Sequence, residues 1–213
     1  MNIRTLNSWL LIICPISMVL VWAVLEPILV GTIDESLAPS VYALDYLELA
    51  SDNEFAVRFI NMLGLLFLSG TMTGLALLGR SLQGNGSGLG SLAAFLFPVG
   101  LAVPVIAVGL SLEAYGTFAA GFTDDAVSLE LLSGAVWTGM PLLWGLGFVL
   151  LGLGIVMEKT SLPVVLGALM ALVGGLLFIG LLLSLNDGLG FVVFLLSILI
   201  TFISGVVLLR RSD

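Results

Sequence analysis

The chain alternates along its whole length between long apolar stretches and short polar segments. Six stretches are almost free of charged residues, and each has about the 20 apolar residues that a membrane-spanning helix needs. They cover residues 9–30, 59–79, 91–112, 136–156, 163–185 and 191–209. This pattern predicts an all-α fold, in which residues 1–213 form a single polytopic membrane domain, a bundle of six transmembrane helices.

The composition strengthens this prediction and excludes several kinds of metal and catalytic site. Hydrophobic residues make up 60% of the chain and charged residues 9%, against roughly 25% charged in an ordinary soluble domain. Histidine is absent and Cys14 is the single cysteine, so metal or haem sites built on these side chains are excluded. Catalytic dyads that depend on histidine are excluded too. We therefore expect no enzymatic activity, no catalytic residue, no metal and no cofactor.

The charges in the loops predict how the helices are oriented. Five of the six basic residues fall at the N-terminus, in the second and fourth loops and at the C-terminus, while acidic residues gather in the other loops. The basic residues concerned are Arg4, Arg80, Lys159, Arg210 and Arg211. Because cytoplasmic loops carry the excess of Lys and Arg, both termini are predicted to be cytoplasmic, in a multi-pass protein of the cell membrane with an acidic exterior.

The acidic excess also bears on partners. With 14 acidic against 6 basic residues, the chain is unsuited to nucleic acid and to docking on anionic lipid. The acidic outer loops would offer carboxylates to Ca²⁺, which takes six to eight oxygen ligands, but the sequence has no EF-hand spacing. Solvated acidic loops are the simpler interpretation.

The first external loop, residues 31–58, contains a segment of helical character. The residues VYALDYLELAS follow Pro39 and Ser40, and the spacing of Asp45, Glu48 and Asp52 places their carboxylates on one face of a helix. Ser40 is the expected N-cap. We predict a short helix that lies in the outer membrane interface.

Three charged residues are predicted at the same depth, near the outer ends of the first three helices. They are Glu26, Arg58 and Glu113, and Asn61 follows Arg58 on the same helix face. A guanidinium beside two carboxylates forms a strong ion cluster in partly apolar surroundings. The pattern predicts a structural clamp on the outer face. A polar ligand site and a coincidence of depth are the alternatives.

Small residues recur at four-residue spacing on two predicted helices. Gly70 and Gly74 lie on the second, and Gly167, Ala171 and Gly175 on the fifth. Small residues let helix backbones approach closely in a membrane. We expect these positions to pack helices within the chain, and contact with a second copy or another subunit is the alternative.

Prolines inside predicted helices indicate kinks. Pro98 and Pro104 lie in the third helix and Pro141 in the fourth. Kinked helices can frame a cavity, and Trp144 would line it. The alternative for these bulky residues is packing in the core or against lipid.

One segment is similar to a known group of proteins. GLGFVLLGLGIVMEKTSLPVVLGALMALVGG (145–175) resembles a widespread group of uncharacterised prokaryotic multi-span membrane proteins. The likeness rests on a short basic turn, a Leu-Pro-x-x-Leu-Gly helix start from Leu162 to Gly167, and a glycine-rich return helix. The resemblance implies a helical membrane bundle of unknown function, and it supplies no catalytic residue.

Two hypotheses for function follow. The first is a non-enzymatic accessory or scaffold subunit that packs in a membrane complex or with copies of itself, surrounded by membrane lipids. The alternative is a binding protein or facilitator for a lipid-like or small neutral molecule, held between kinked helices. No ionisable residue lies near the middle of any predicted span, which argues against ion-coupled transport.

Overall fold

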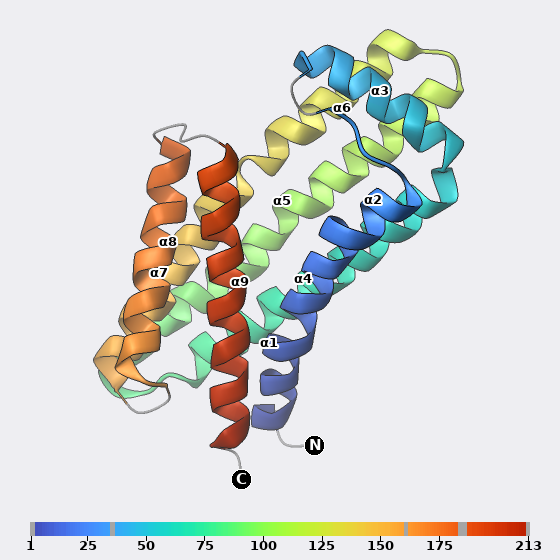
Figure 1. Cartoon of the computed structure of the whole chain (residues 1–213). Coiled ribbons are helices and arrows are strands. Elements are labelled where there is room, and N and C mark those ends of the chain that lie inside the picture. Colours follow the sequence, from blue (N-terminus) through green and yellow to red (C-terminus); the bar gives the residue numbers. More distant parts are fainter. Residues whose placement is uncertain (1–2, 35–36, 160–161, 183–186, 212–213) are drawn as a thin grey trace. The chain divides into compact units, whose positions relative to one another are not determined.

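The computed structural model describes residues 3–34, 37–159, 162–182 and 187–211, and within these ranges it is helical with no β-strand. Figure 1 shows the helices in chain order. Their bounds are α1 Ile3–Leu20, η1 Val21–Leu25 (a π-helical turn), α2 Glu26–Leu29, α3 Pro39–Asp52, α4 Glu54–Ser81, η2 Gly84–Gly86, α5 Ser87–Ala119, α6 Thr123–Trp137, α7 Met140–Glu158, α8 Val164–Leu182 and α9 Asp187–Arg210. The all-α prediction is confirmed.

Five helical segments of the described residues are long and apolar enough to cross a membrane. They are Ile3–Leu29, Glu54–Ser81, Gly84–Ala119, Thr123–Glu158 and Leu189–Arg210. A shorter apolar helix covers Val164–Gly180, and the predicted fifth span continues from it into residues outside the described ranges. The prediction of a membrane protein with several spanning helices therefore agrees with the structure.

The chain divides into two compact units, and α1, α4 and α5 contribute residues to both. Unit 1 comprises residues 1–16, 67–101 and 140–213, and unit 2 comprises residues 17–66 and 102–139. Their charges differ sharply: unit 1 has five basic and three acidic residues, whereas unit 2 has one basic and eleven acidic. The basic and acidic residues that were predicted to lie in different loops therefore also lie mostly in different units.

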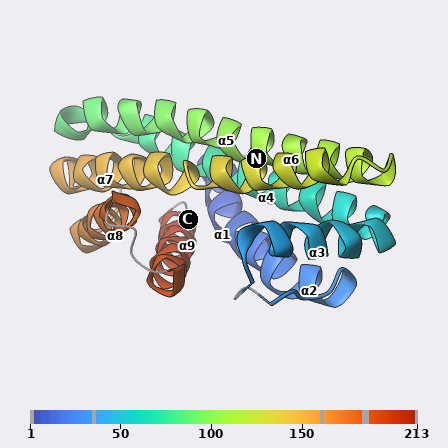
Figure 2. The ribbon, with the colours of Figure 1, turned by 90° about the horizontal axis from the view of Figure 1, so that it is seen from above.

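Glycine positions bring the helices of unit 1 close together. Helix α8 packs against both α7 and α9, and Figure 2 shows the three side by side. A Cβ placed on Gly174 would lie 2.5 Å from the carbonyl oxygen of Gly145, and one on Gly152 would meet the backbone of Gly167 and Ala171. Since real Cβ atoms do not approach backbone so closely, only glycine permits this α7–α8 contact.

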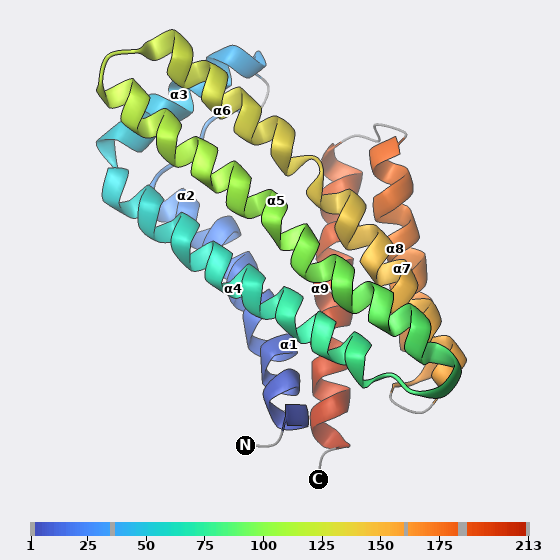
Figure 3. The ribbon, with the colours of Figure 1, turned by 180° about the vertical axis from the view of Figure 1, so that it is seen from behind.

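Unit 2 contains a helical hairpin where the sequence predicted the end of a span and a loop. Helix α5 runs to Ala119, seven residues past the predicted end at 112, and α6 follows after a short turn (Figure 3). Gly121 lies in this turn with φ +88°, a left-handed conformation that favours glycine and ends helices. The helix continues past the predicted end of the span because the polar residues after 112 lower the hydropathy without interrupting the helix.

The helix predicted in the first external loop is present as α3, and it packs against α6. It buries Ala43, Leu47 and Ala50. The prediction of Ser40 as N-cap was wrong, because the helix begins at Pro39 and its N-cap is Ala38, which has no side-chain cap. Proline suits the first helical position since its fixed φ is already helical and its missing N–H has no intrahelical role there.

Candidate functional site

Arg58 lies on α4 and pairs with a carboxylate of its own helix. Its Nη2 is 2.8 Å from Oε1 of Glu54, one turn earlier, and the two side chains are 49% and 59% exposed. Among the described residues, Glu26 and Glu113 do not come within ion-pair distance of Arg58. Glu113 is exposed on α5, and Asn61 is half-buried on α4. The structure thus does not join these four residues into one ion cluster, because the partner four residues away on the same helix lies nearest.

Glu26 belongs instead to a group of buried and half-buried polar side chains in unit 2. The hydroxyl of Tyr46 on α3 donates a hydrogen bond to its Oε1 at 3.2 Å. The Tyr46 ring lies 6.2 Å from the ring of Tyr115 on α5 and stacks on Tyr42. Glu26 follows directly after the π-helical turn η1, a deformation often found at functional positions.

The same group continues along α5 and α6. Ser111 donates to the Oγ of Ser133 at 2.9 Å, and Ser133 donates to the carbonyl of Ala107 at 2.9 Å. Tyr115 is only 5% exposed, and neither its hydroxyl nor Oε2 of Glu130 has a hydrogen-bond partner among the described residues. We define the tyrosine–glutamate cluster as Glu26, Tyr46, Ser111, Tyr115, Glu130 and Ser133.

The chemistry of this cluster is that of hydroxyl donors around carboxyl groups. Burial raises the pKa of Tyr46 far above its usual range, with smaller contributions from the neighbouring Tyr115 and Glu26. The Tyr46 hydroxyl therefore keeps its proton and acts as a donor to Glu26. The cluster contains two carboxyl groups and no basic residue, so it suits protons, hydroxyls or cations rather than anions.

Sequence reasoning missed most of this cluster because it treated residues 113–135 as an external loop. A signal was nevertheless present. Ala126, Glu130 and Ser133 are spaced at i, i+4 and i+7, the repeat of one helix face, and Ser111 and Tyr115 are four residues apart. Helical periodicity could have identified these positions where hydropathy did not.

Most of the predicted helix-packing residues contact helices of their own unit. A Cβ on Gly70 would meet the side chain of Cys14, and one on Gly74 would lie 2.9 Å from Leu11. A Cβ on Gly167 would lie 2.8 Å from the Gly152 carbonyl oxygen, in the contact that also involves Ala171. Gly175 differs, since no described atom lies within 4 Å of a Cβ placed there.

The residues predicted to line a cavity do not all belong to one unit. Pro98, Pro141 and Trp144 belong to unit 1, and Pro104 belongs to unit 2. Trp144 is 1% exposed, with its ring 6.0 Å from Phe148 and 5.6 Å from Phe194. Aromatic packing therefore surrounds Trp144, and a cavity between the third and fourth predicted helices stays a prediction.

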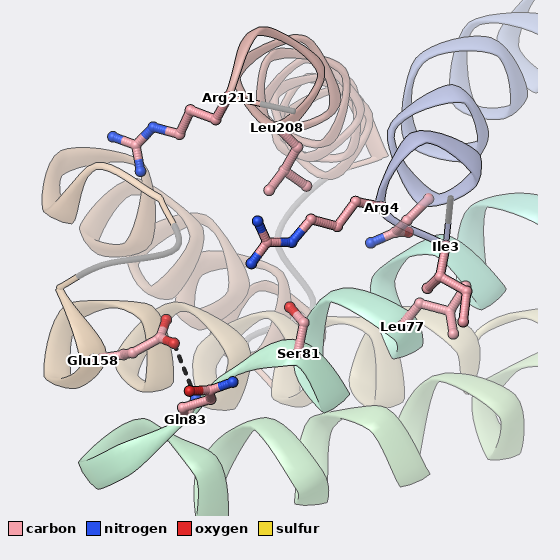
Figure 4. Close-up of a pocket in the computed structure, with 9 residues that line it drawn as sticks. Ile3, Arg4, Leu77, Ser81, Gln83, Glu158, Leu208 and Arg211 are labelled. Carbon is pink, nitrogen blue, oxygen red and sulfur yellow. Dashed lines mark hydrogen bonds between the residues drawn. The ribbon is translucent and has the colours of Figure 1, made fainter. Parts of the chain in front are cut away.

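A pocket of about 340 Å³ lies within unit 1, in the range typical of small-molecule sites (Figure 4). The start of α1, the ends of α4, α7 and α9, and the residues next to them form its walls. Its polar lining residues are Arg4, Asn7, Ser81, Gln83, Glu158 and Arg211. Ile3, Leu77 and Leu208 supply an apolar part of the lining. We call this site the terminal pocket.

Charged groups of both signs line the terminal pocket. Oε1 of Glu158 accepts the backbone N–H of Gln83 at 2.9 Å, and Figure 4 shows Arg4 extending into the space between Leu208 and Ser81. Asn7 is 5% exposed, and its Oδ1 has no hydrogen-bond partner among the described residues. A buried acceptor without a donor is costly, which makes Asn7 a natural contact for a bound molecule.

The two polar regions differ in the ligands that they suit. The tyrosine–glutamate cluster presents carboxyls and hydroxyls, whereas the terminal pocket presents guanidinium groups beside apolar side chains. Within the described residues, no group of three or more His, Cys, Asp or Glu side chains could hold a metal ion. No protein-family model, curated protein or solved structure matches the chain.

Proposed function

We propose that this chain is a non-enzymatic, multi-pass protein of the cell membrane that binds a lipid-like molecule in the terminal pocket. The observation that carries the proposal is the composition of the pocket. Arginine, serine and amide groups share the lining with Ile3, Leu77 and Leu208, and Ile3 is 72% exposed. A polar headgroup and an apolar chain would each find matching side chains there.

The proposed topology has six spans, with both termini cytoplasmic. The arrangement of the terminal pocket supports it, because Arg4 near the start of the chain and Arg211 near its end line the same pocket. Ser81 at the end of α4 and Glu158 at the end of α7 line it too, as an even number of crossings between these points requires. The five basic residues of unit 1 agree with a cytoplasmic location of these helix ends.

In this topology α3 is an interfacial helix of the first external loop. Its buried face of Ala43, Leu47 and Ala50 and its exposed Glu48 and Asp52 support that position. The terminal pocket would then lie at the inner membrane surface, at the depth of lipid headgroups.

The proposal is tested by blocking the pocket with a bulky side chain. Ser81 and Ser87 are a matched pair, since both are exposed and each hydroxyl donates to the carbonyl three residues earlier. Only Ser81 lines the pocket. Ser81→Trp should remove lipid that the wild-type chain retains in native mass spectrometry, and Ser87→Trp should retain it. Equal retention by the wild type and both variants would refute the proposal.

An accessory or scaffold subunit is the second candidate. The open surroundings of Gly175 favour it, because this glycine has the spacing of a packing position without a described neighbour. If this face of α8 receives a partner, Gly175→Leu should reduce the native mass of the complex to that of the single chain. An unchanged mass for wild type and variant, each equal to one chain, would argue against the scaffold function.

A further inference from the structure

The terminal pocket carries a more specific inference about its ligand, which rests on the proposed lipid binding. Among the described residues, its lining contains two guanidinium groups and one carboxylate, so the formal charge of these side chains is +1. The acidic balance of the whole chain makes this exception informative, since five of the six basic residues belong to unit 1. The charge of the pocket favours an anion.

The kind of basic residue points to phosphate. Arg4 lies in the first turn of α1 and Arg211 directly follows α9, so two guanidinium groups reach one pocket from opposite ends of the chain. Guanidinium is planar and presents paired N–H donors that match the oxygens of a phosphate group. Basic pockets between helices at the cytoplasmic surface are a recurrent way to hold anionic lipid headgroups.

Asn7 indicates a second feature of the ligand. Its Oδ1 is a buried acceptor without a donor among the described residues. An ionised phosphodiester offers only acceptors and would leave this oxygen unsatisfied. A headgroup that also carries a hydroxyl would satisfy it, because the hydroxyl can donate to the amide oxygen.

We infer that the terminal pocket binds an anionic glycerophospholipid whose headgroup carries a hydroxyl. Arg4 and Arg211 hold the phosphate, Asn7 accepts the headgroup hydroxyl, and an acyl chain lies along Ile3, Leu77 and Leu208. Glu158 stays at the edge of this arrangement, where its Oε1 accepts the Gln83 N–H.

Three lipids of matched acyl chains separate the contributions of charge and hydroxyl. Phosphatidylglycerol has both, phosphatidylmethanol has the charge alone, and phosphatidylcholine has no net charge. We expect the full-length protein in native mass spectrometry to retain phosphatidylglycerol about tenfold better than phosphatidylcholine, with phosphatidylmethanol in between. Equal retention of all three lipids would overturn the inference.

Single substitutions test which residues cause these lipid preferences. Arg4→Gln and Arg211→Gln should each lower the preference for the anionic lipids, whereas Arg80→Gln, a basic residue of unit 1 outside the pocket lining, should not. Asn7→Leu should remove the difference between phosphatidylglycerol and phosphatidylmethanol and leave the effect of charge. If a variant does not fold, the comparison of the three lipids on the wild type still decides.

Two further results separate the sources of phosphate and the two proposals. Inorganic phosphate at millimolar concentration should not displace phosphatidylglycerol, and displacement would identify a soluble phosphate compound as the ligand and overturn the lipid assignment. If Ser81→Trp removes all three lipids equally and the wild type does not discriminate among them, lipid binding stands and the headgroup inference fails. If Ser81→Trp removes none, the proposed function itself fails.

Discussion

Both units are built from α-helices, but different contacts hold them together. In unit 1, helix backbones approach at glycine, as where α8 crosses α7 at Gly145 and Gly174. In unit 2, side chains fill the spaces, as where Tyr46 meets Tyr115 and Ser111 bonds to Ser133. The helices of this chain therefore associate through two kinds of contact. Small residues and polar pairs are two separate solutions to the lack of a hydrophobic drive within lipid.

The largest expected effect on stability comes from adding one methyl group to a glycine in each unit. Gly152→Ala in unit 1 would place a Cβ against the backbone of Gly167 and Ala171, which cannot shift as a side-chain tip can. We expect a loss of about 3 kcal/mol in the free energy of unfolding, from denaturant titration in detergent. Gly134→Ala in unit 2 is the control.

The Gly134→Ala variant should change the free energy of unfolding in the opposite direction. No described atom lies within 4 Å of a Cβ placed there, and the residue is within helix α6. Alanine in a helix is better than glycine by about 0.5–1 kcal/mol, so this variant should be slightly more stable. If both variants gained stability, the close contact between α7 and α8 would not hold in solution.

Gly64→Ala is the variant that could break the comparison, because Gly64 belongs to unit 2 and yet has a close neighbour. A Cβ there would lie 2.5 Å from Cε2 of Trp22, whose ring also meets Trp137 edge to face at 5.8 Å. We expect a loss of about 2 kcal/mol and a change in tryptophan fluorescence as the Trp22 ring is displaced. Unchanged stability together with an unchanged spectrum would show that a Cβ at position 64 does not displace the Trp22 ring.

The packing glycines illustrate what sequence can and cannot predict. The spacing of Gly167 and Ala171 correctly identified a close contact, but the partner positions Gly145 and Gly152 on α7 were missed. The spacing shows that one face of the helix carries small residues, but it does not show which helix packs against that face. Gly174 is rotated by about 20° from Gly167 around the helix and Gly175 by about 80°, so contact continues through Gly174. The four-residue spacing therefore does not follow this contact beyond Ala171, and Gly175 lies outside it.

The tyrosine–glutamate cluster illustrates a different limit. Helical periodicity correctly predicted α3 as a separate helix, since its apolar and acidic positions repeat with the helical period. Only hydropathy was applied to residues 113–135. It failed for α6, where Asp124, Asp125 and Glu130 lower the average although the segment is helical. Which carboxyls become buried depends on the tertiary contact of α3 with α6, and this contact is not local in the sequence.

The loss of one hydrogen bond in that cluster should have the next smaller effect on stability. Tyr46→Phe removes the donor to Oε1 of Glu26 and keeps the ring that packs on Tyr115. The free energy of unfolding should fall by about 1 kcal/mol, because a half-buried carboxyl oxygen loses its partner.

Glu130→Gln should behave differently from Tyr46→Phe although both residues belong to the cluster. Oε2 of Glu130 is buried without a hydrogen-bond partner among the described residues, and an amide group would place a neutral donor there. We expect unchanged or higher stability in the same titration. A loss as large as that of Tyr46→Phe would mean that the Glu130 carboxylate has a bound cation or proton donor in the folded protein.

Arg58 is expected to give the smallest effect. The sequence predicted a clamp, in which the loss of Arg58 would leave two carboxylates without a partner in partly apolar surroundings. In the structure its ion pair with Glu54 is exposed, and pairs of this kind on one helix contribute about 0.3–0.5 kcal/mol. Arg58→Ala should therefore cost no more than this, and the loss should disappear in a Glu54→Ala background or at high salt. A loss above about 2 kcal/mol that survives both conditions would restore the clamp, because only carboxylates outside the Glu54 pair could then account for it.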